Sequence, residues 1–121
     1  MKKRILLIED NANNRRLEKF LLEKADYEVI EALDALSGIT LAREERPAAI
    51  IIDLRLSDMN GVAAAKVLRG DESTCDIPII FVTASVLEEG IARMKEISKS
   101  TYIMKPINTR TFAEEISRQI E

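Results

Sequence analysis

Residues 48–61, "AAIIIDLRLSDMNG", contain the feature that decides the fold, an apolar run that ends in a carboxylate. The run from Ala48 to Ile52 leads directly into Asp53. A continuous, β-branched run of this kind is typical of a strand that is covered on both faces, as in a parallel sheet. We therefore expect a central strand here, with Asp53 held at its carboxyl end.

The rest of the chain alternates short apolar runs with longer amphipathic segments. Expected strands lie at 5–8, 28–32, 49–52, 77–84 and 101–104. Expected helices lie at 13–25, 35–46, 61–70, 87–98 and 109–120. This β-α alternation predicts an α/β fold in which helices cover both faces of a parallel sheet. The 121 residues suit one domain, 1–121, with nothing left over for a second.

The spacing of apolar residues predicts which face of each helix is buried. In 13–25 we expect Leu17, Phe20 and Leu21 to face the core, with Asn13 or Asn14 as the N-cap. Asp34 is the expected cap of the second helix, and Pro47 ends it. In 61–70 the expected inward residues are Val62, Ala65 and Val67 or Leu68. In 87–98 they are Leu87, Ile91, Met94 and Ile97 or Ser98, and in 109–120 they are Phe112, Ile116 and Ile120.

Composition excludes several classes of function. The chain has no His, which removes Ser-His-Asp triads and His metal sites, and its single Cys cannot form an internal disulfide. The net charge is −3 without a basic stripe, so direct nucleic-acid binding is not expected. The apolar run near the start is too short for a signal peptide, and no membrane insertion is expected. These features predict a soluble, cytoplasmic protein.

Polar residues with related chemistry follow several of the expected strands. Glu9 and Asp10 follow the first, Asp53 the third and Lys105 the fifth, and Thr83 lies near the end of the fourth. The carboxyl ends of parallel strands meet at one edge of the sheet, so these groups should converge there. Carboxylates this close call for a hard cation such as Mg²⁺, and a lysine can pair with a phosphoryl group. The set indicates phosphoryl chemistry with a carboxylate nucleophile.

Motifs spread over the whole chain resemble the receiver domains of two-component response regulators, the CheY-like family. The matching stretches are "ILLIEDN" (5–11), "RPAAIIIDLRLSDMNG" (46–61), "IPIIFVTA" (77–84) and "YIMKPI" (102–107). The resemblance implies a flavodoxin-like (βα)5 fold with strand order 2-1-3-4-5. No glycine-rich phosphate loop follows the first strand, which disfavours nucleotide binding.

The resemblance also implies a role for each matching residue. Asp53 is expected to accept a phosphoryl group from a histidine kinase or histidine phosphotransfer protein. The implied ligands of Mg²⁺, or of Mn²⁺ as a substitute, are Glu9, Asp10, Asp53 and the backbone carbonyl of Arg55. Thr83 and Tyr102 are the expected switch residues, and Lys105 is expected to pair with the phosphoryl group and to precede Pro106 through a cis peptide bond. The surface that controls a downstream protein target would lie at about 85–120.

Two further positions are expected to tune the rate of dephosphorylation. Arg55 and Ser85 each lie two residues beyond a site residue, and both should flank the phosphoryl group. Departures from the family pattern do not affect the expected site residues. Ser57 stands where proline is usual, which suggests a looser loop. Gly38 lies within a helix, where glycine costs about 1 kcal/mol. The loop before the fifth strand lacks the usual glycine.

Other functions stay open at this point. A phosphohydrolase with an aspartate nucleophile also places Asp at a strand tip, but it needs a second Asp where this chain has Arg55. A receiver-like interaction module without phosphorylation would have lost an acid or the lysine, and all are present. The chain could also be a receiver module from a larger regulator or hybrid kinase. In none of the receiver readings is it a turnover enzyme; at most it is a weak autophosphatase.

Overall fold

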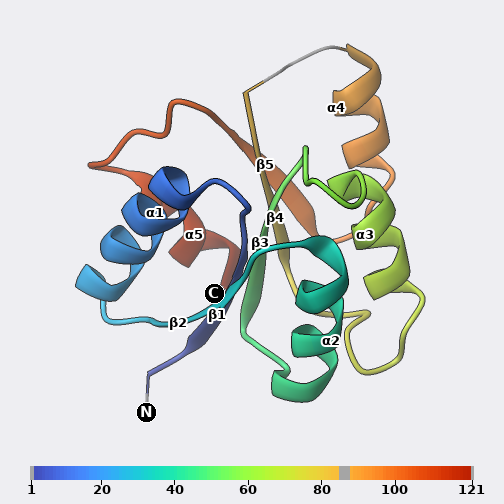
Figure 1. The fold of residues 1–121 in the computed structure, drawn as a ribbon, viewed down its shortest axis with the longest axis horizontal. Coiled ribbons are helices and arrows are strands. Elements are labelled where there is room, and N and C mark those ends of the chain that lie inside the picture. The colour runs from blue at the N-terminus through green and yellow to red at the C-terminus, as the bar shows by residue number, and fades with distance from the viewer. Residues whose placement is uncertain (1, 85–87, 121) are drawn as a thin grey trace.

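The computed structural model describes residues 2–84 and 88–120, which form a parallel sheet between two layers of helices (Figure 1). The strand order is β2-β1-β3-β4-β5, as the resemblance implied. The strands are β1 (Arg4–Ile8), β2 (Glu28–Ala32), β3 (Ala49–Asp53), β4 (Ile79–Thr83) and β5 (Ser100–Met104).

Each strand is followed by a helix, and the helices divide between the two faces of the sheet. They are α1 (Ala12–Lys24), α2 (Ala35–Glu45), α3 (Gly61–Arg69), α4 (Glu88–Lys95) and α5 (Phe112–Ile120). α1 and α5 lie on one side of the sheet, and α2, α3 and α4 lie on the other (Figure 1). This arrangement confirms the expected α/β architecture.

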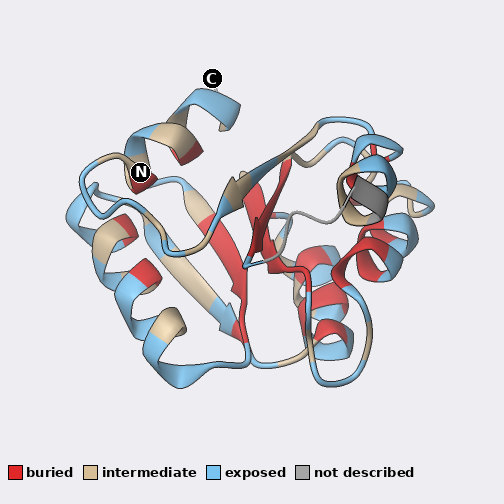
Figure 2. Ribbon diagram, turned by 90° about the horizontal axis from the view of Figure 1, so that it is seen from above, coloured by how far each residue is buried: buried red, intermediate tan, exposed pale blue. Residues whose placement is uncertain are grey.

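The central strands are buried because both of their faces are covered by helices (Figure 2). All residues of β3 and β4 are buried, whereas β5, at the edge, is partly exposed. Alternate residues of the strands enter different cores: Ile50 and Ile52 pack with α2 and α3, and Ile51 packs with α1 and α5. The continuous apolar run therefore has the cause that we inferred from the sequence.

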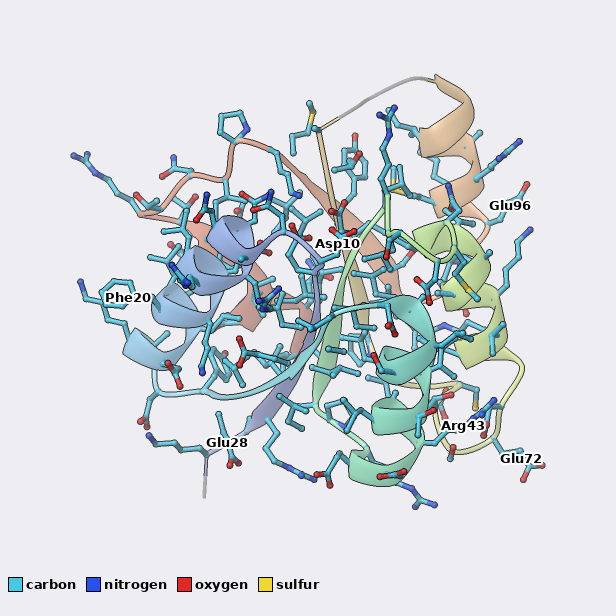
Figure 3. All side chains as sticks on the ribbon, viewed as in Figure 1. Asp10, Phe20, Glu28, Arg43, Glu72 and Glu96 are labelled. Carbon is cyan, nitrogen blue, oxygen red and sulfur yellow. The ribbon has the colours of Figure 1, made fainter. Side chains whose placement is uncertain are left out.

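The first helix begins earlier and faces differently than the sequence predicted. Its N-cap is Asn11, whose side chain accepts the backbone N–H of Asn14, so the expectation of Asn13 or Asn14 as the cap was wrong. Leu17 and Phe20 were expected in the core, yet Phe20 is 61% exposed and points away from the sheet (Figure 3). The buried residues of α1 are Glu18 and Leu22, with Leu21 partly buried.

The remaining helices agree more closely with the predicted faces. Asp34 caps α2 by accepting the N–H of Ser37, and Gly70 is the C-cap of α3. The predicted inward residues that are buried are Val62, Ala65, Leu68, Met94, Ile97, Phe112 and Ile116. Val67 is exposed, because Leu68 takes the inward position. Leu87 lies outside the described residues.

Gly38 is explained by how closely α2 approaches the sheet. A Cβ atom at this position would lie 2.4 Å from Cδ1 of Ile8 on β1. Ile8 is fully buried, so its side chain has no free space to move into. The glycine costs helix propensity, and this cost is offset by close packing of the helix against the strand that precedes Glu9.

Two loops show features that the sequence did not predict. In the loop before β5, where the usual glycine is absent, Lys99 adopts a left-handed backbone (φ 51°), a conformation that usually favours glycine. In the loop after β3, Asp58 bonds to the start of α2.

Among the helices of the described residues, none combines the length and the apolar character that a membrane span requires.

Candidate functional site

Strand register places the three acidic residues at one edge of the sheet. Ile8 of β1 pairs with Ile52 of β3, so the residues that follow them, Glu9 and Asp53, lie side by side at the carboxyl ends of these strands. One carboxylate oxygen from each of Glu9, Asp10 and Asp53 can be chosen so that all lie within 4.8 Å of one another. Asp10 is exposed near the upper end of the strands in Figure 3, whereas Glu9 and Asp53 are buried. This donor set suits a hard divalent cation.

Lys105 lies between two of these carboxylates. Its Nζ is 3.2 Å from Oδ2 of Asp53 and 3.3 Å from Oε1 of Glu9. Burial lowers the pKa of the Lys105 ammonium, but the charges of Asp53 and Glu9 and the hydrogen bonds to them outweigh burial, so the pKa is raised overall. Lys105 therefore stays positively charged and partly neutralises the acidic edge. The Lys105–Pro106 peptide bond is cis.

Glu9 is held in place by the first turn of α1. Nδ2 of Asn14 donates to Oε1 of Glu9 at 3.1 Å, and the Arg15 guanidinium donates to the Glu9 carbonyl at 3.0 Å. Burial, followed by the hydrogen bond and the charge of Asp53, raises the pKa of Glu9 to about 7, against the opposing effects of Lys105 and Asn14. The cluster is thus electrostatically strained, and a bound cation would relieve it.

The loop after β3 folds back tightly over the strand end. The Arg55 N–H donates to Oδ1 of Asp53 at 3.2 Å, which orients the carboxylate. Gly61 donates its N–H to the Leu54 carbonyl, and a Cβ at Gly61 would lie 2.6 Å from the carbonyl oxygen of Asp53. Glycine is therefore required where α3 begins. The N-cap of α3 is Asn60, whose side-chain oxygen accepts the N–H of Val62.

Asp58 fastens the same loop to the start of α2. Its two carboxylate oxygens accept the N–H groups of Ala35 and Leu36, each at 2.9 Å. These hydrogen bonds, and the bond from Ala35 first among them, lower the pKa of Asp58. With Asp34 bonding Ser37, three backbone donors at this helix end have partners. We expected a looser loop because Ser57 replaces the usual proline, and the sequence did not indicate that the neighbouring Asp58 attaches the loop to α2.

The two residues expected to act as a switch lie on neighbouring strands. Thr83 ends β4 and is 2% exposed, whereas Tyr102 lies on β5, pairs in register with Phe81 and is 38% exposed. Arg55 is exposed beside the site. Ser85, the second position expected to tune the rate, lies outside the described residues.

Comparisons with known proteins agree with this geometry. The family model of the response regulator receiver domain matches residues 5–117. The chain belongs to the response regulator receiver domain family. Within the family, the chain is 35% identical over 116 residues to the polar-differentiation response regulator DivK of Brucella anthropi, covering 96% of this chain and 94% of that protein. The DivK of Brucella ovis is equally similar, at 35% over 116 residues with the same coverage.

Solved receiver domains share the fold. A CheY-like receiver domain protein of Methanospirillum hungatei is 28% identical, with a TM-score of 0.92 over 99% of this chain and 94% of that one. The receiver domain of a sensor histidine kinase from Pseudomonas aeruginosa is also 28% identical, with a TM-score of 0.90 over 99% of this chain and 98% of that one. That crystal structure holds a magnesium ion in its active-site cleft.

Proposed function

We propose that this receiver domain accepts a phosphoryl group on Asp53 from a histidine kinase or a histidine phosphotransfer protein. The observation that supports the proposal is the convergence of Asp53 with Glu9, Asp10 and Lys105 at one edge of the sheet. Asp53 lies at the end of a fully buried strand, and its carboxylate accepts a hydrogen bond from the Arg55 N–H. The carboxylate is therefore held in a fixed position from which it can attack phosphorus. Membership of the receiver family favours a signalling role for this arrangement.

The proposed chemical step forms one bond and breaks one. A carboxylate oxygen of Asp53 attacks phosphorus, the P–N bond of the donor phosphohistidine breaks, and its electron pair returns to the imidazole nitrogen. The phosphoryl group then carries negative charge beside Lys105, whose ammonium lies 3.2 Å from the accepting carboxylate. The Thr83 hydroxyl is the expected hydrogen-bond donor to a phosphoryl oxygen. The chain contributes position and charge, and it does not turn over a substrate.

Mg²⁺ is the cofactor that we propose for this step. Glu9, Asp10, Asp53 and the backbone carbonyl of Arg55 would hold it, and three oxygen ligands that can come within 4.8 Å of one another fit such an ion. When bound, Mg²⁺ would neutralise charge on the attacking carboxylate and the phosphoryl group. The magnesium ion in the receiver domain from Pseudomonas aeruginosa supports this choice.

We further propose that phosphorylation changes a protein-binding surface. Thr83 would turn toward the phosphoryl group, and Tyr102 would then move from its present exposed position toward the interior. Tyr102 lies on β5, between α4 and α5, so its movement would alter the face that these elements form. The proposed output is control of a downstream protein, in the cytoplasm where the kinase acts.

Phosphorylation by a small donor tests the proposal directly. The chain is incubated with acetyl phosphate and Mg²⁺, and its intact mass is measured for one added phosphoryl group of about 80 Da. Asp53→Asn should abolish the adduct, whereas the matched control Asp26→Asn, at an exposed turn, should retain it. An unmodified wild-type chain, or an adduct that survives Asp53→Asn, would contradict the proposal.

The same samples separate this function from a phosphohydrolase. A phosphohydrolase would release phosphate continuously from a generic phosphomonoester such as p-nitrophenyl phosphate. We expect release no faster than the slow loss of phosphate from the phosphorylated chain itself. Faster, sustained release that depends on Asp53 would favour the hydrolase instead.

A further inference from the structure

Glu18 is a buried acid that the proposed phosphoryl chemistry does not use. It lies on the inward face of α1 and is 2% exposed. Within the described part of the chain, no hydrogen-bond donor and no salt-bridge partner reaches its carboxylate, although buried charges are normally paired. The position therefore has a cost for folding, which the charge of Lys105 offsets only in part.

The Glu18 side chain borders a cavity of about 320 Å³ between α1 and the loop that follows β5. Its walls are largely apolar and come from Leu17, Ala84, Pro106 and Ile107. The polar groups along it are Asn14, Glu18 and Lys105. The volume is at the small end for ligand sites, so it suits one short side chain or small molecule and not a nucleotide.

The charges around this cavity favour a cation. Lys105 contacts Glu9 and Asp53 already, and Asn14 donates to Glu9, so both polar neighbours of Glu18 are engaged elsewhere. Burial first, and then the negative charges of Glu9 and Asp53, raise the pKa of Glu18 to about 8, while Lys105 acts in the opposite direction. A second positive group beside Glu18 would offset both the burial and the repulsion.

We propose that this cavity binds an organic cation, an ammonium or guanidinium group on an aliphatic stem, with Glu18 as its counter-ion. The apolar walls would cover the methylene groups of the stem, as protein surfaces do for lysine and arginine side chains. The buried carboxylate at the wall would accept the charged head. This binding does not require phosphorylation, so it holds or fails independently of the proposed phosphoryl acceptance.

The cation has two possible sources with the same chemistry. A partner protein could insert a lysine or arginine side chain while it docks next to the acidic edge, or a free alkylamine could occupy the cavity. The cavity opens beside Lys105, so either ligand would sit next to the residue that we expect to pair with the phosphoryl group.

Binding of n-butylammonium to the full chain tests the proposal. Backbone amide shifts are followed by NMR at about pH 9, above the Glu18 pKa of about 8. We expect saturable shifts around the cavity, with affinity reduced about tenfold or more in Glu18→Gln, a loss of one strong charge-assisted contact. Glu23→Gln, at an exposed acid of the same helix, is the matched control and should bind as wild type does.

Three results would overturn the proposal. One is equal affinity in wild type and Glu18→Gln. Another is equally tight binding of n-butanol, which would show that the cavity responds to the apolar stem alone. The third is binding that is lost in Asp10→Asn and retained in Glu18→Gln, which would place the cation in the acidic cluster.

A second ligand distinguishes the two sources. Nα-acetyl-lysine methylamide carries the same ammonium with a peptide-like end that must remain outside the cavity. Binding of this compound at an affinity within about threefold of butylammonium would support a partner side chain. Exclusion of this compound, with Glu18-dependent binding of butylammonium retained, would support a free amine.

Discussion

Replacement of Glu18 by Gln should stabilise the protein in a way that depends on pH. Glutamine keeps the size and polarity of the side chain and removes its ionisation. The folded-state pKa of Glu18 is about 8, against an ordinary value of 4.5, because burial and neighbouring acids disfavour the charge. An acid whose pKa is raised on folding binds its proton more tightly in the folded chain, so wild-type stability falls as pH rises from 4.5 through 8.

The size of the effect follows from the pKa difference. Each unit corresponds to about 1.4 kcal/mol, so wild type loses about 3 kcal/mol by pH 7 and about 5 kcal/mol well above pH 8. These are upper values, because local relaxation and water entry reduce the penalty for a buried charge. Glu18→Gln should therefore match wild type near pH 4 and exceed its free energy of unfolding by roughly 2–3 kcal/mol at neutral pH.

Urea unfolding followed by far-UV circular dichroism measures this difference across the pH range. Glu23→Gln on the same helix is the control, and its difference from wild type should not change with pH. A constant difference between Glu18→Gln and wild type from about pH 4 to about pH 9 would refute the argument, because it would mean that Glu18 ionises normally in the folded chain.

Three other predictions concern packing, the loop after β3 and the site. Gly38→Ala should destabilise the fold by about 1–3 kcal/mol, because its Cβ would meet Ile8, and Ile8→Val in the same chain should recover part of the loss in urea unfolding. Asp58→Ala should lower the thermal midpoint and remove protection from amide exchange at the start of α2; unchanged protection there would contradict its role as a cap. If the Arg55 side chain hinders the hydrolytic water, Arg55→Ala should change the rate of phosphate release from the phosphorylated chain, and an identical rate would reject that role.

The sequence predicted the acidic cluster well because strand geometry determines it. Apolar runs end at Ile8 and Ile52, and parallel pairing of these runs leaves little freedom for the residues that follow. The contribution of Lys105 was predicted for the same reason, since it follows the last strand. The periodicity of apolar residues and the position of a residue after a strand are sufficient to predict a site that is assembled by the backbone pairing of a sheet.

The face of α1 was predicted only in part, because two rotations of this helix fit its sequence: Leu21 packs against the core as expected, whereas Phe20 does not. Leu17 and Phe20 satisfy one helical spacing, and Glu18 with Leu22 satisfies the other. The rotation that forms buries Glu18 and Leu22 and brings Asn14 to Glu9, a contact between side chains that periodicity does not contain. A charged residue such as Glu18 is also an unusual choice for a buried position.

Asp58 was missed for a related reason. Its partners, the N–H groups of Ala35 and Leu36, are 23 and 22 residues away, respectively, and belong to another element. The sequence shows directly that Ser57 stands where proline is usual. It does not show the attachment of Asp58, because that depends on how the loop and α2 pack together in the fold.

The pairing of Ile8 with Ile52 implies that the acidic cluster is as durable as the sheet itself. Amides in such central ladders exchange with solvent through opening of the whole domain, whereas loops and helix ends open locally and far more often. Local fluctuations of the loop after β3 or of α1 would thus change access to the carboxylates without separating Glu9 from Asp53. The proximity of Glu9 to Asp53 and the protection of the slowest-exchanging amides should accordingly disappear at the same denaturant concentration.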